Sequence, residues 1–129
     1  MDENKDIVVQ QEKNGLGSIR IADEVVRIIA GLAATEGPGV AGMSGGIVGG
    51  ITEMLGRKNL SKGVKVDVGE KEAAIDIFVV VEYGSKIPEV ASQIQQKVKN
   101  AVQEMTGLNV VEVNVNIQGV AFSNAENKE

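Results

Sequence analysis

The chain has 129 residues, 43% of them hydrophobic, and a formal net charge of −5 at pH 7. This length fits one globular domain with its own core. Cysteine and histidine are both absent, which excludes disulfides, thiolate and imidazole catalysis, and the usual zinc sites. The negative charge also disfavours nucleic acid as a partner. We therefore expect no catalytic residues, no metal and no cofactor.

Both ends of the chain are polar. Residues 1–14 and 123–129 lack apolar periodicity, so we expect two flexible tails around a folded domain of residues 15–122. The N-terminus carries no pattern that an export machinery reads. The longest uncharged run, residues 37–52, is shorter than the roughly 20 apolar residues of a spanning helix. A cytoplasmic protein that does not cross a membrane by itself is the expectation.

The first elements are a strand, a helix and a less regular segment. Residues 17–21 predict a short strand, and Asp23 and Glu24 favour a helix start directly after it. Apolar residues then recur at helical spacing until Gly37-Pro38-Gly39 ends the helix. Residues 40–43 predict a brief strand, residues 47–55 a short helix, and residues 57–62 a polar turn.

A β-hairpin is the next prediction, with residues 64–68 and 73–83 as its strands. If paired residue numbers sum to 141, Val66 lies opposite Ile75 and Val64 opposite Ile77 on one face. On the other face Lys65 then lies opposite Asp76, which predicts one exposed ion pair there.

The last elements are a helix and a strand. Pro88 suits a first helical turn, and an apolar stripe follows at helical spacing until Gly107 ends the helix. Residues 111–117 alternate between apolar and polar side chains, as in a strand with one buried face. The order β-α-β, a Gly-rich segment, then β-β-α-β predicts a single α+β domain, with helices on one face of a mainly antiparallel sheet.

The Gly-rich segment GVAGMSGGIVGGI, residues 39–51, lacks both the Gly-Lys-Ser/Thr ending of a phosphate loop and the dinucleotide G-x-G-x-x-G pattern. Two interpretations remain open. The segment is a conformable loop that contacts a partner or an anion through backbone N–H groups. Alternatively, Gly45/Gly49 and Gly46/Gly50 space one side of a short helix for close packing. Because each helical glycine costs roughly 1 kcal/mol relative to alanine, we expect an irregular, partner-facing segment.

An interaction surface is predicted beside this segment. Phe78 and Val80 lie on the same strand face as Asp76, and helices that cover the opposite face cannot bury them. Exposed apolar surface of this kind is typical of a binding site for another protein. The predicted surface combines these two residues with the glycines and the basic turn: Phe78, Val80, Gly45, Gly46, Gly49, Gly50, Arg57 and Lys58.

Five segments in this order resemble the alkaline shock protein family of Gram-positive bacteria, the envelope stress response family. They are SIRIADEVV (18–26), GVKVD (63–67), IDIFVVVEYG (75–84), IPEVA (87–91) and VEVNVNI (111–117). The likeness covers residues 16–121 and is closer to the short members often encoded beside acetyl-CoA carboxylase subunits. It implies a small cytoplasmic, non-enzymatic protein linked to envelope stress or fatty-acid synthesis. Some members are held at the membrane by an integral membrane partner, and the family offers no catalytic residues to transfer.

Two functions follow as alternatives. The first is an interaction or scaffold protein, self-associating as a homo-oligomer, whose protein partner is membrane-anchored or related to acetyl-CoA carboxylase. The second is a small-ligand or anion-binding module that uses the Gly-rich segment, residues 37–56. Converging ionisable groups in a pocket would favour the second, and an exposed apolar patch or open sheet edge the first.

Overall fold

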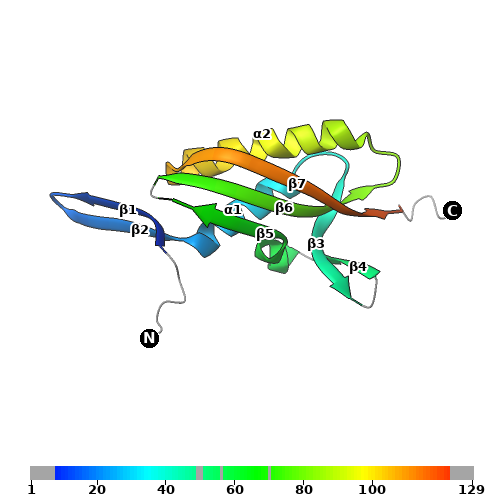
Figure 1. Ribbon diagram of the computed structural model, residues 1–129, viewed down its shortest axis with the longest axis horizontal. Coiled ribbons are helices and arrows are strands. Elements are labelled where there is room, and N and C mark those ends of the chain that lie inside the picture. The colour runs from blue at the N-terminus through cyan, green and yellow to red at the C-terminus, as the bar shows by residue number, and fades with distance from the viewer. Residues whose placement is uncertain (1–7, 49–50, 56, 70, 123–129) are drawn as a thin grey trace.

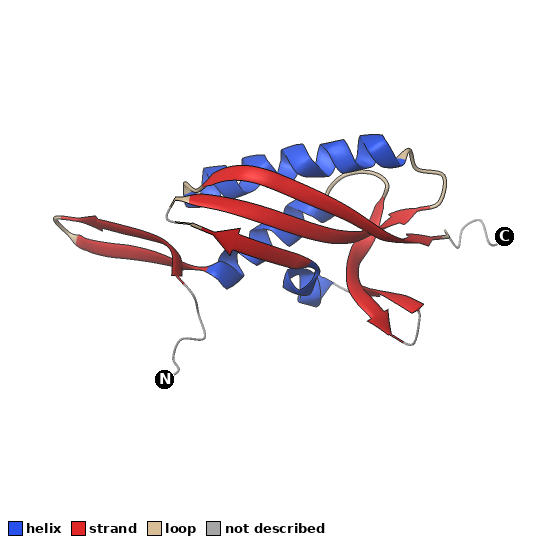
Figure 2. Ribbon diagram, in the orientation of Figure 1, coloured by secondary structure: helices blue, strands red, loops and turns tan. Residues whose placement is uncertain are grey.

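The computed structural model describes residues 8–48, 51–55, 57–69 and 71–122. Figures 1 and 2 show both α-helices on one side of the main sheet, behind it in this view. This confirms the predicted α+β class with a mainly antiparallel sheet. The elements in chain order are β1 (Val8–Asn14), β2 (Gly17–Ala22), α1 (Asp23–Thr35), β3 (Val40–Val48), β4 (Ile51–Leu55), the 3₁₀-helix η1 (Arg57–Gly63), β5 (Val64–Val68), β6 (Glu72–Glu82), α2 (Ile87–Thr106) and β7 (Asn109–Ala121).

Strand β6 organises the main sheet. Strand β7 runs parallel to it along its whole length, from the pair Glu72↔Asn109 to the pair Glu82↔Ala121. Strand β5 pairs antiparallel with residues 73–77 of β6, and β3 pairs antiparallel with residues 79–81. Since β7 occupies one edge of β6, β5 and β3 share the other edge end to end. Helix α2 is the crossover that the parallel β6–β7 pair requires (Figure 1).

The core lies between this sheet and the two helices. Alternate residues of β6 point into it because strand side chains alternate between faces. They are Ile75, Ile77, Val79 and Val81, each at most 1% exposed. Apolar residues at helical spacing on α1 and α2 cover them, and Gly107, with φ +79°, ends α2 as predicted. Burial on one face explains why this part of the fold follows from the sequence pattern.

The predicted β5–β6 hairpin register is confirmed. Val66 pairs with Ile75, Val64 with Ile77 and Lys65 with Asp76. Val64, Ile75 and Ile77 are all buried. A shift by one residue would turn these side chains away from the core, which is why the apolar pattern alone specified the register.

The N-terminal part differs from the predicted tail. Residues 8–14 form β1, which pairs antiparallel with β2 around a turn at Gly15 and Leu16. This hairpin is separate from the main sheet and extends away from it (Figure 1). Strand β2 was predicted from the sequence, and its Ile21 packs against the core. Residues 8–14 show no alternation of apolar and polar side chains, so the sequence carried no signal for β1. Residues 1–7 and 123–129 of the predicted tails lie outside the described residues.

The Gly-rich segment also differs from the prediction. Residues 40–48 form one continuous strand, β3, and residues 51–55 form strand β4 instead of the predicted short helix. The β3–β4 register shifts by one residue between Ser44 and Ile47, at Gly45 and Gly46. Glycine inside a strand commonly marks such a bulge. The helical packing interpretation of the glycine spacing is therefore wrong.

Candidate functional site

The face of the sheet that the helices leave uncovered is largely polar, and part of it is internally hydrogen-bonded. The Asn114 side-chain amide donates to Asp76 Oδ1 at 2.8 Å and to Glu112 Oε2 at 3.0 Å. The Asn116 amide donates to the Ile77 carbonyl oxygen at 3.2 Å. The bonds to Asp76 and Ile77 join β7 to β6 and the bond to Glu112 lies within β7, so polar groups in this part of the open face are engaged within the protein.

Lys65 takes a different partner from the one predicted. It is paired in the ladder with Asp76, but its ammonium lies over the Phe78 ring, 5.5 Å from the ring centroid. Both ion pairs recorded among the described residues involve Arg27, so the predicted Lys65–Asp76 ion pair is absent there. An exposed ion pair and an exposed cation–π contact each contribute at most about 1 kcal/mol, so neither dominates intrinsically. The Asn114 amide already donates a hydrogen bond to Asp76, and this favours the contact of Lys65 with the Phe78 ring.

Phe78 lines a hollow of about 250 Å³ on this open face, which we call the Phe78 hollow. It lies where β3 and the η1–β5 segment meet along the same edge of β6. Phe78 itself is half-buried, whereas Lys62 and Lys65 are exposed. Gly45, at the β3 bulge, contributes backbone without a side chain. The lining residues are Ser44, Gly45, Lys62, Lys65, Phe78 and Gln118.

Two glycines allow η1 to hold its position at this junction. A Cβ at Gly63 would lie 2.8 Å from Met43 Cε, 3.0 Å from Met43 Cβ and 3.2 Å from the Phe78 carbonyl oxygen. A Cβ at Gly31 of α1 would lie 2.9 Å from the Leu60 carbonyl oxygen. Leu60 is buried in the core at 6% exposure. The 3₁₀-helix is thus packed against both layers, and its last turn presents Lys62 to the hollow.

The charges around the hollow are not balanced. Nearby on α1, the Arg27 guanidinium contacts Asp23 Oδ2 at 2.9 Å and Glu24 Oε1 at 2.7 Å. The hydrogen bond from Arg27 is the main reason that the pKa of Glu24 is lowered from its ordinary value. Lys62 and Lys65, by contrast, have no carboxylate within ion-pair distance in the described part of the chain. The hollow is therefore locally basic on an acidic protein.

The structure brings together only part of the predicted surface. Phe78 and Gly45 meet in the hollow. Val80 is only 5% exposed, so it offers no contact area. The β6–β7 register shifts between Val79 and Val80, so the simple alternation that predicted an exposed Val80 does not hold at this point. The backbones of three further predicted residues lie in β3 and η1: Gly46, Arg57 and Lys58. Gly49 and Gly50 lie outside the described residues.

Two lysines of the site, Lys62 and Lys65, were missing from the predicted surface. The predicted register contained a signal for Lys65, because it placed this residue opposite Asp76 and therefore one diagonal step from Phe78. Lys62 belonged to the basic cluster of Arg57, Lys58 and Lys62 that the sequence shows beside the Gly-rich segment, but its approach to Phe78 depends on how η1 packs.

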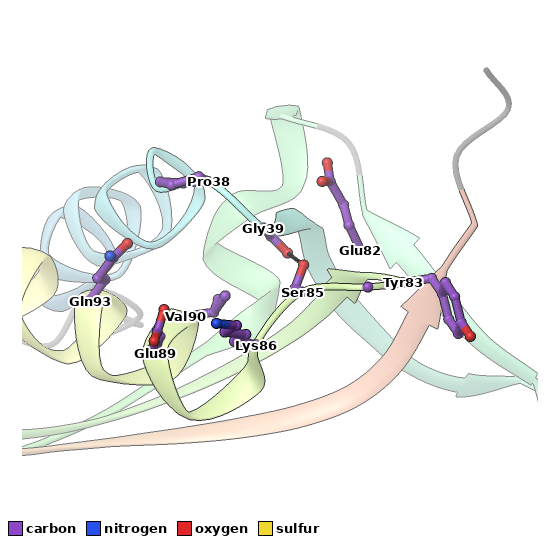
Figure 3. A pocket seen from close by; sticks show the side chains of 10 residues that line it. Pro38, Gly39, Glu82, Tyr83, Ser85, Lys86, Glu89, Val90 and Gln93 are labelled. Atoms are coloured by element: carbon purple, nitrogen blue, oxygen red, sulfur yellow. Dashed lines mark hydrogen bonds between the residues drawn. The ribbon is translucent and has the colours of Figure 1, made fainter. Parts of the chain in front are cut away.

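A second hollow, of about 410 Å³, lies between residues 38–39 and the start of α2 (Figure 3). Gly39 has φ +91°, and a Cβ there would lie 2.7 Å from Val90 Cγ2. Lys86 lines this hollow together with Glu82 and Glu89, so its charges have both signs. Figure 3 shows Tyr83 directed away from the other lining residues. This mixture favours no single class of ligand.

In the described ranges, no helix has the length and apolar character needed to cross a membrane. The same residues contain no group of three or more Asp or Glu side chains placed to hold a metal ion.

The chain is similar in sequence to several bacterial proteins. The chain is 39% identical to the Bacillus subtilis protein YqhY over 122 residues, covering 95% of this chain and 90% of that protein. It is 42% identical to B. subtilis YloU over 110 residues, covering 84% and 92%. A Streptococcus pyogenes stress response regulator gls24 homolog is 34% identical over 102 residues, covering 78% of this chain and 57% of that protein.

Among solved structures, a MamM-CTD variant matches 75% of this chain and 94% of its own, with a TM-score of 0.42 and 18% identity. The family profile that matches residues 11–122 is that of the Asp23 family, described as having a cell envelope-related function. Its name is unrelated to residue 23 of this chain. The matched residues and the relatives agree with the resemblance seen in the sequence, and the chain belongs to this family of alkaline shock and Gls24-like proteins.

Proposed function

We propose that the chain is a non-enzymatic interaction protein of the cell-envelope stress response, and that it binds a protein partner at the Phe78 hollow. One observation carries this proposal. The hollow combines an aromatic ring with two lysines that form no ion pair among the described residues, next to a part of the face that is internally hydrogen-bonded. Aromatic and basic side chains around a concavity are typical of protein contact sites.

The residue types of the hollow support a binding role over a catalytic one. Nucleophilic catalysis needs a hydroxyl or amine beside a general base that is oriented by a third group. The hollow contains the Ser44 hydroxyl and the Gln118 amide, but its described lining has no carboxylate or imidazole to accept a proton. The alternative of a small-ligand or anion-binding module at residues 37–56 has less support, since residues 40–48 form a strand paired with β4 and β6 and not an open loop.

Self-association is the second part of the proposal. Among the described strands, β7 pairs only with β6, which leaves its outer edge open. Helix α2 covers part of this edge, where the Gln103 side chain accepts from the Val110 N–H and the Gln95 side chain donates to the Val113 carbonyl oxygen, each at 3.0 Å. An uncovered edge further along β7 can pair with another chain. A homo-oligomer through this edge is therefore compatible with a free Phe78 hollow.

The cellular setting of the proposal comes from family membership. The family is described by a cell envelope-related function, and one relative carries the name of a stress response regulator. We place the chain in the cytoplasm near the membrane, held there by a membrane-anchored partner. A partner related to acetyl-CoA carboxylase, and hence a role in fatty-acid synthesis control, is the other form of the proposal.

Site-specific photo-crosslinking in the native cell tests it. A photoreactive phenylalanine analogue replaces Phe78, and the same analogue at Gln96, exposed on α2, is the control. We expect one protein partner to be crosslinked from position 78 and not from position 96, and a reciprocal pull-down should recover the chain. Equal crosslinking from both positions, or none from position 78, would contradict the proposal.

A further inference from the structure

We infer that the Phe78 hollow recognises an acidic residue of a partner's peptide segment, with the carboxylate between Lys62 and Lys65 and an adjacent apolar side chain against the Phe78 ring. This inference rests on the proposed function and names the chemistry of the partner at that site. Three properties of the hollow support it: its charge, its size and the position of Lys65 over the ring.

The charge selects an anion. Both lysines are exposed and line one hollow, and neither has a carboxylate within ion-pair distance among the described residues. Arg27, in the neighbouring hollow that Lys62 and Lys65 also line, is already paired with two carboxylates, those of Asp23 and Glu24. The two lysines are thus the cations of this region that are free to bind a carboxylate from another molecule.

The size selects a side chain over a cofactor. Small-molecule sites usually enclose roughly 300–1,000 Å³, whereas the Phe78 hollow has about 250 Å³ and is open to solvent. A single acidic side chain with part of its neighbour fits such a volume. The part of the Gly-rich segment that borders the hollow, residues 40–48, forms a strand and not a phosphate-binding loop.

A peptide also fits better than a lipid surface or a nucleic acid. Headgroup-binding clusters usually contain about 4–8 basic residues on one surface, whereas two lysines line this concave hollow. The net charge of −5 would repel an extended polyanion or an anionic bilayer. A short acidic segment brings only local negative charge, so its attraction to the two lysines is opposed less by the rest of the protein.

The contact between Lys65 and Phe78 explains why an apolar neighbour should accompany the carboxylate. The ammonium lies 5.5 Å from the ring centroid and shields that side of the ring. An exposed cation–π contact contributes at most about 1 kcal/mol, and a carboxylate placed between Lys62 and Lys65 gains contacts with two ammonium groups rather than one. A bound carboxylate would therefore draw Lys65 from the ring and leave the ring for an apolar side chain.

The test uses two capped tripeptides, Glu-Leu-Glu and its uncharged counterpart Gln-Leu-Gln. Each is titrated into the ¹⁵N-labelled full chain and followed by amide chemical shifts. We expect saturable shifts at Gly45, Lys62, Lys65 and Phe78 with the acidic peptide only, weakening as salt is added. Equal binding of the two peptides, or shifts centred elsewhere, would overturn the inference.

Charge variants provide the matched control. Lys62→Gln with Lys65→Gln removes the proposed contacts, and Lys71→Gln with Lys99→Gln makes the same charge change at exposed lysines outside the hollow. Circular dichroism checks that both variants are folded. We expect the first pair to weaken acidic-peptide binding about tenfold or more, the cost of losing a charge-assisted bond. An unchanged affinity in the first variant would contradict the inference.

Further probes separate the possible sources of the anion and the two levels of the proposal. Anionic phosphatidylglycerol vesicles and inorganic phosphate are titrated in the same way. Vesicle binding without peptide binding, or phosphate binding as tight as the peptide, would overturn recognition of an acidic peptide. A crosslinked partner at position 78 that is insensitive to the lysine changes would leave the proposed function intact and refute only this inference. Peptide binding without any crosslinked partner would refute the proposed function instead.

Discussion

Lys65 and Phe78 lie on adjacent strands of the helix-free face, with the lysine ammonium 5.5 Å from the ring centroid. Asp76, directly opposite Lys65 in the ladder, accepts a hydrogen bond from Asn114 of β7 instead. The register therefore gives Lys65 two possible partners, Asp76 and Phe78. Asn114 of β7 occupies Asp76, and Lys65 lies over Phe78.

This relationship makes a spectroscopic prediction. Phe78→Leu should move the side-chain proton shifts of Lys65 toward unperturbed values, because the ring current above the aromatic face is lost. Asp76→Asn should leave those shifts almost unchanged, since the carboxylate does not hold the lysine. Two-dimensional NMR of the side chains measures both. Shifts that respond to Asp76→Asn and not to Phe78→Leu would restore the ion pair predicted from the sequence.

The packing of η1 makes a stability prediction. Gly63→Ala should lower the free energy of unfolding by about 1–3 kcal/mol, because the new methyl group would overlap Met43 and the Phe78 carbonyl oxygen. Gly69→Ala is the control, since nothing lies within 4 Å of a Cβ at that position. Urea unfolding measures both variants. A loss at Gly69 as large as the loss at Gly63 would show that close packing is not the cause.

The Arg27–Glu24 contact makes a prediction about pH. Arg27 lowers the pKa of Glu24 from its ordinary 4.5, so the ionised carboxylate favours the folded state. This contribution is present above the unfolded pKa and disappears as pH falls through the lower folded pKa. Because the pair is partly exposed, its contribution is roughly 0.3–0.5 kcal/mol at neutral pH.

Glu24→Gln should therefore destabilise the protein slightly at pH 7 and by less in acid. Unfolding curves of the parent and the variant, recorded at several pH values between neutral and strongly acidic, measure this difference. A difference that stays constant, or one that grows as pH falls, would contradict the assigned role of the carboxylate.

The glutamines of α2 make a prediction about the edge of β7. Gln103→Ala removes the acceptor of the Val110 N–H, so hydrogen exchange at Val110 should accelerate and stability should fall by about 1 kcal/mol. Gln96→Ala is the matched control, because Gln96 is exposed and its side chain bonds Asn100 of its own helix. Amide hydrogen exchange, followed by NMR, measures the protection of Val110 in both variants. Unaltered protection of Val110 in the first variant would show that Gln103 does not cover this edge.

Local pattern was sufficient wherever one face of an element is buried. The apolar alternation around Val66 and Ile75 predicted the β5–β6 register, and the stripe before Gly107 predicted α2 with its end. A shift of the strand register, or a break in the helix, would expose core side chains to water and destabilise the fold. The short apolar patterns are therefore enough to predict these elements. The family likeness was visible for the same reason, because its segments are these buried elements.

Two elements whose sequence carries no clear apolar period could not be predicted in this way. The strand β1 adds only a partner for β2, and β3 continues through a Gly-rich stretch because β4 and β6 pair with it on both sides. The local composition of polar residues in β1 and of glycine in β3 disfavours regular structure, and β3 also depends on β6, a strand distant in sequence. In both β1 and β3, the hydrogen bonds to neighbouring strands outweigh the low intrinsic strand propensity of the residues.

The sequence by itself determined the α+β class, the central hairpin register, the helix-free position of Phe78 and the family. Only the tertiary structure decided that Val80 is buried, that Lys65 lies over Phe78, and that Lys62 joins them in one hollow. The physical reason is the shared edge of β6. β5 pairs with residues 73–77 of β6, and β3 pairs with residues 79–81 along the same edge. η1 packs into the junction between them through Gly63. The site therefore consists of residues that are brought together by tertiary packing, which local periodicity does not encode.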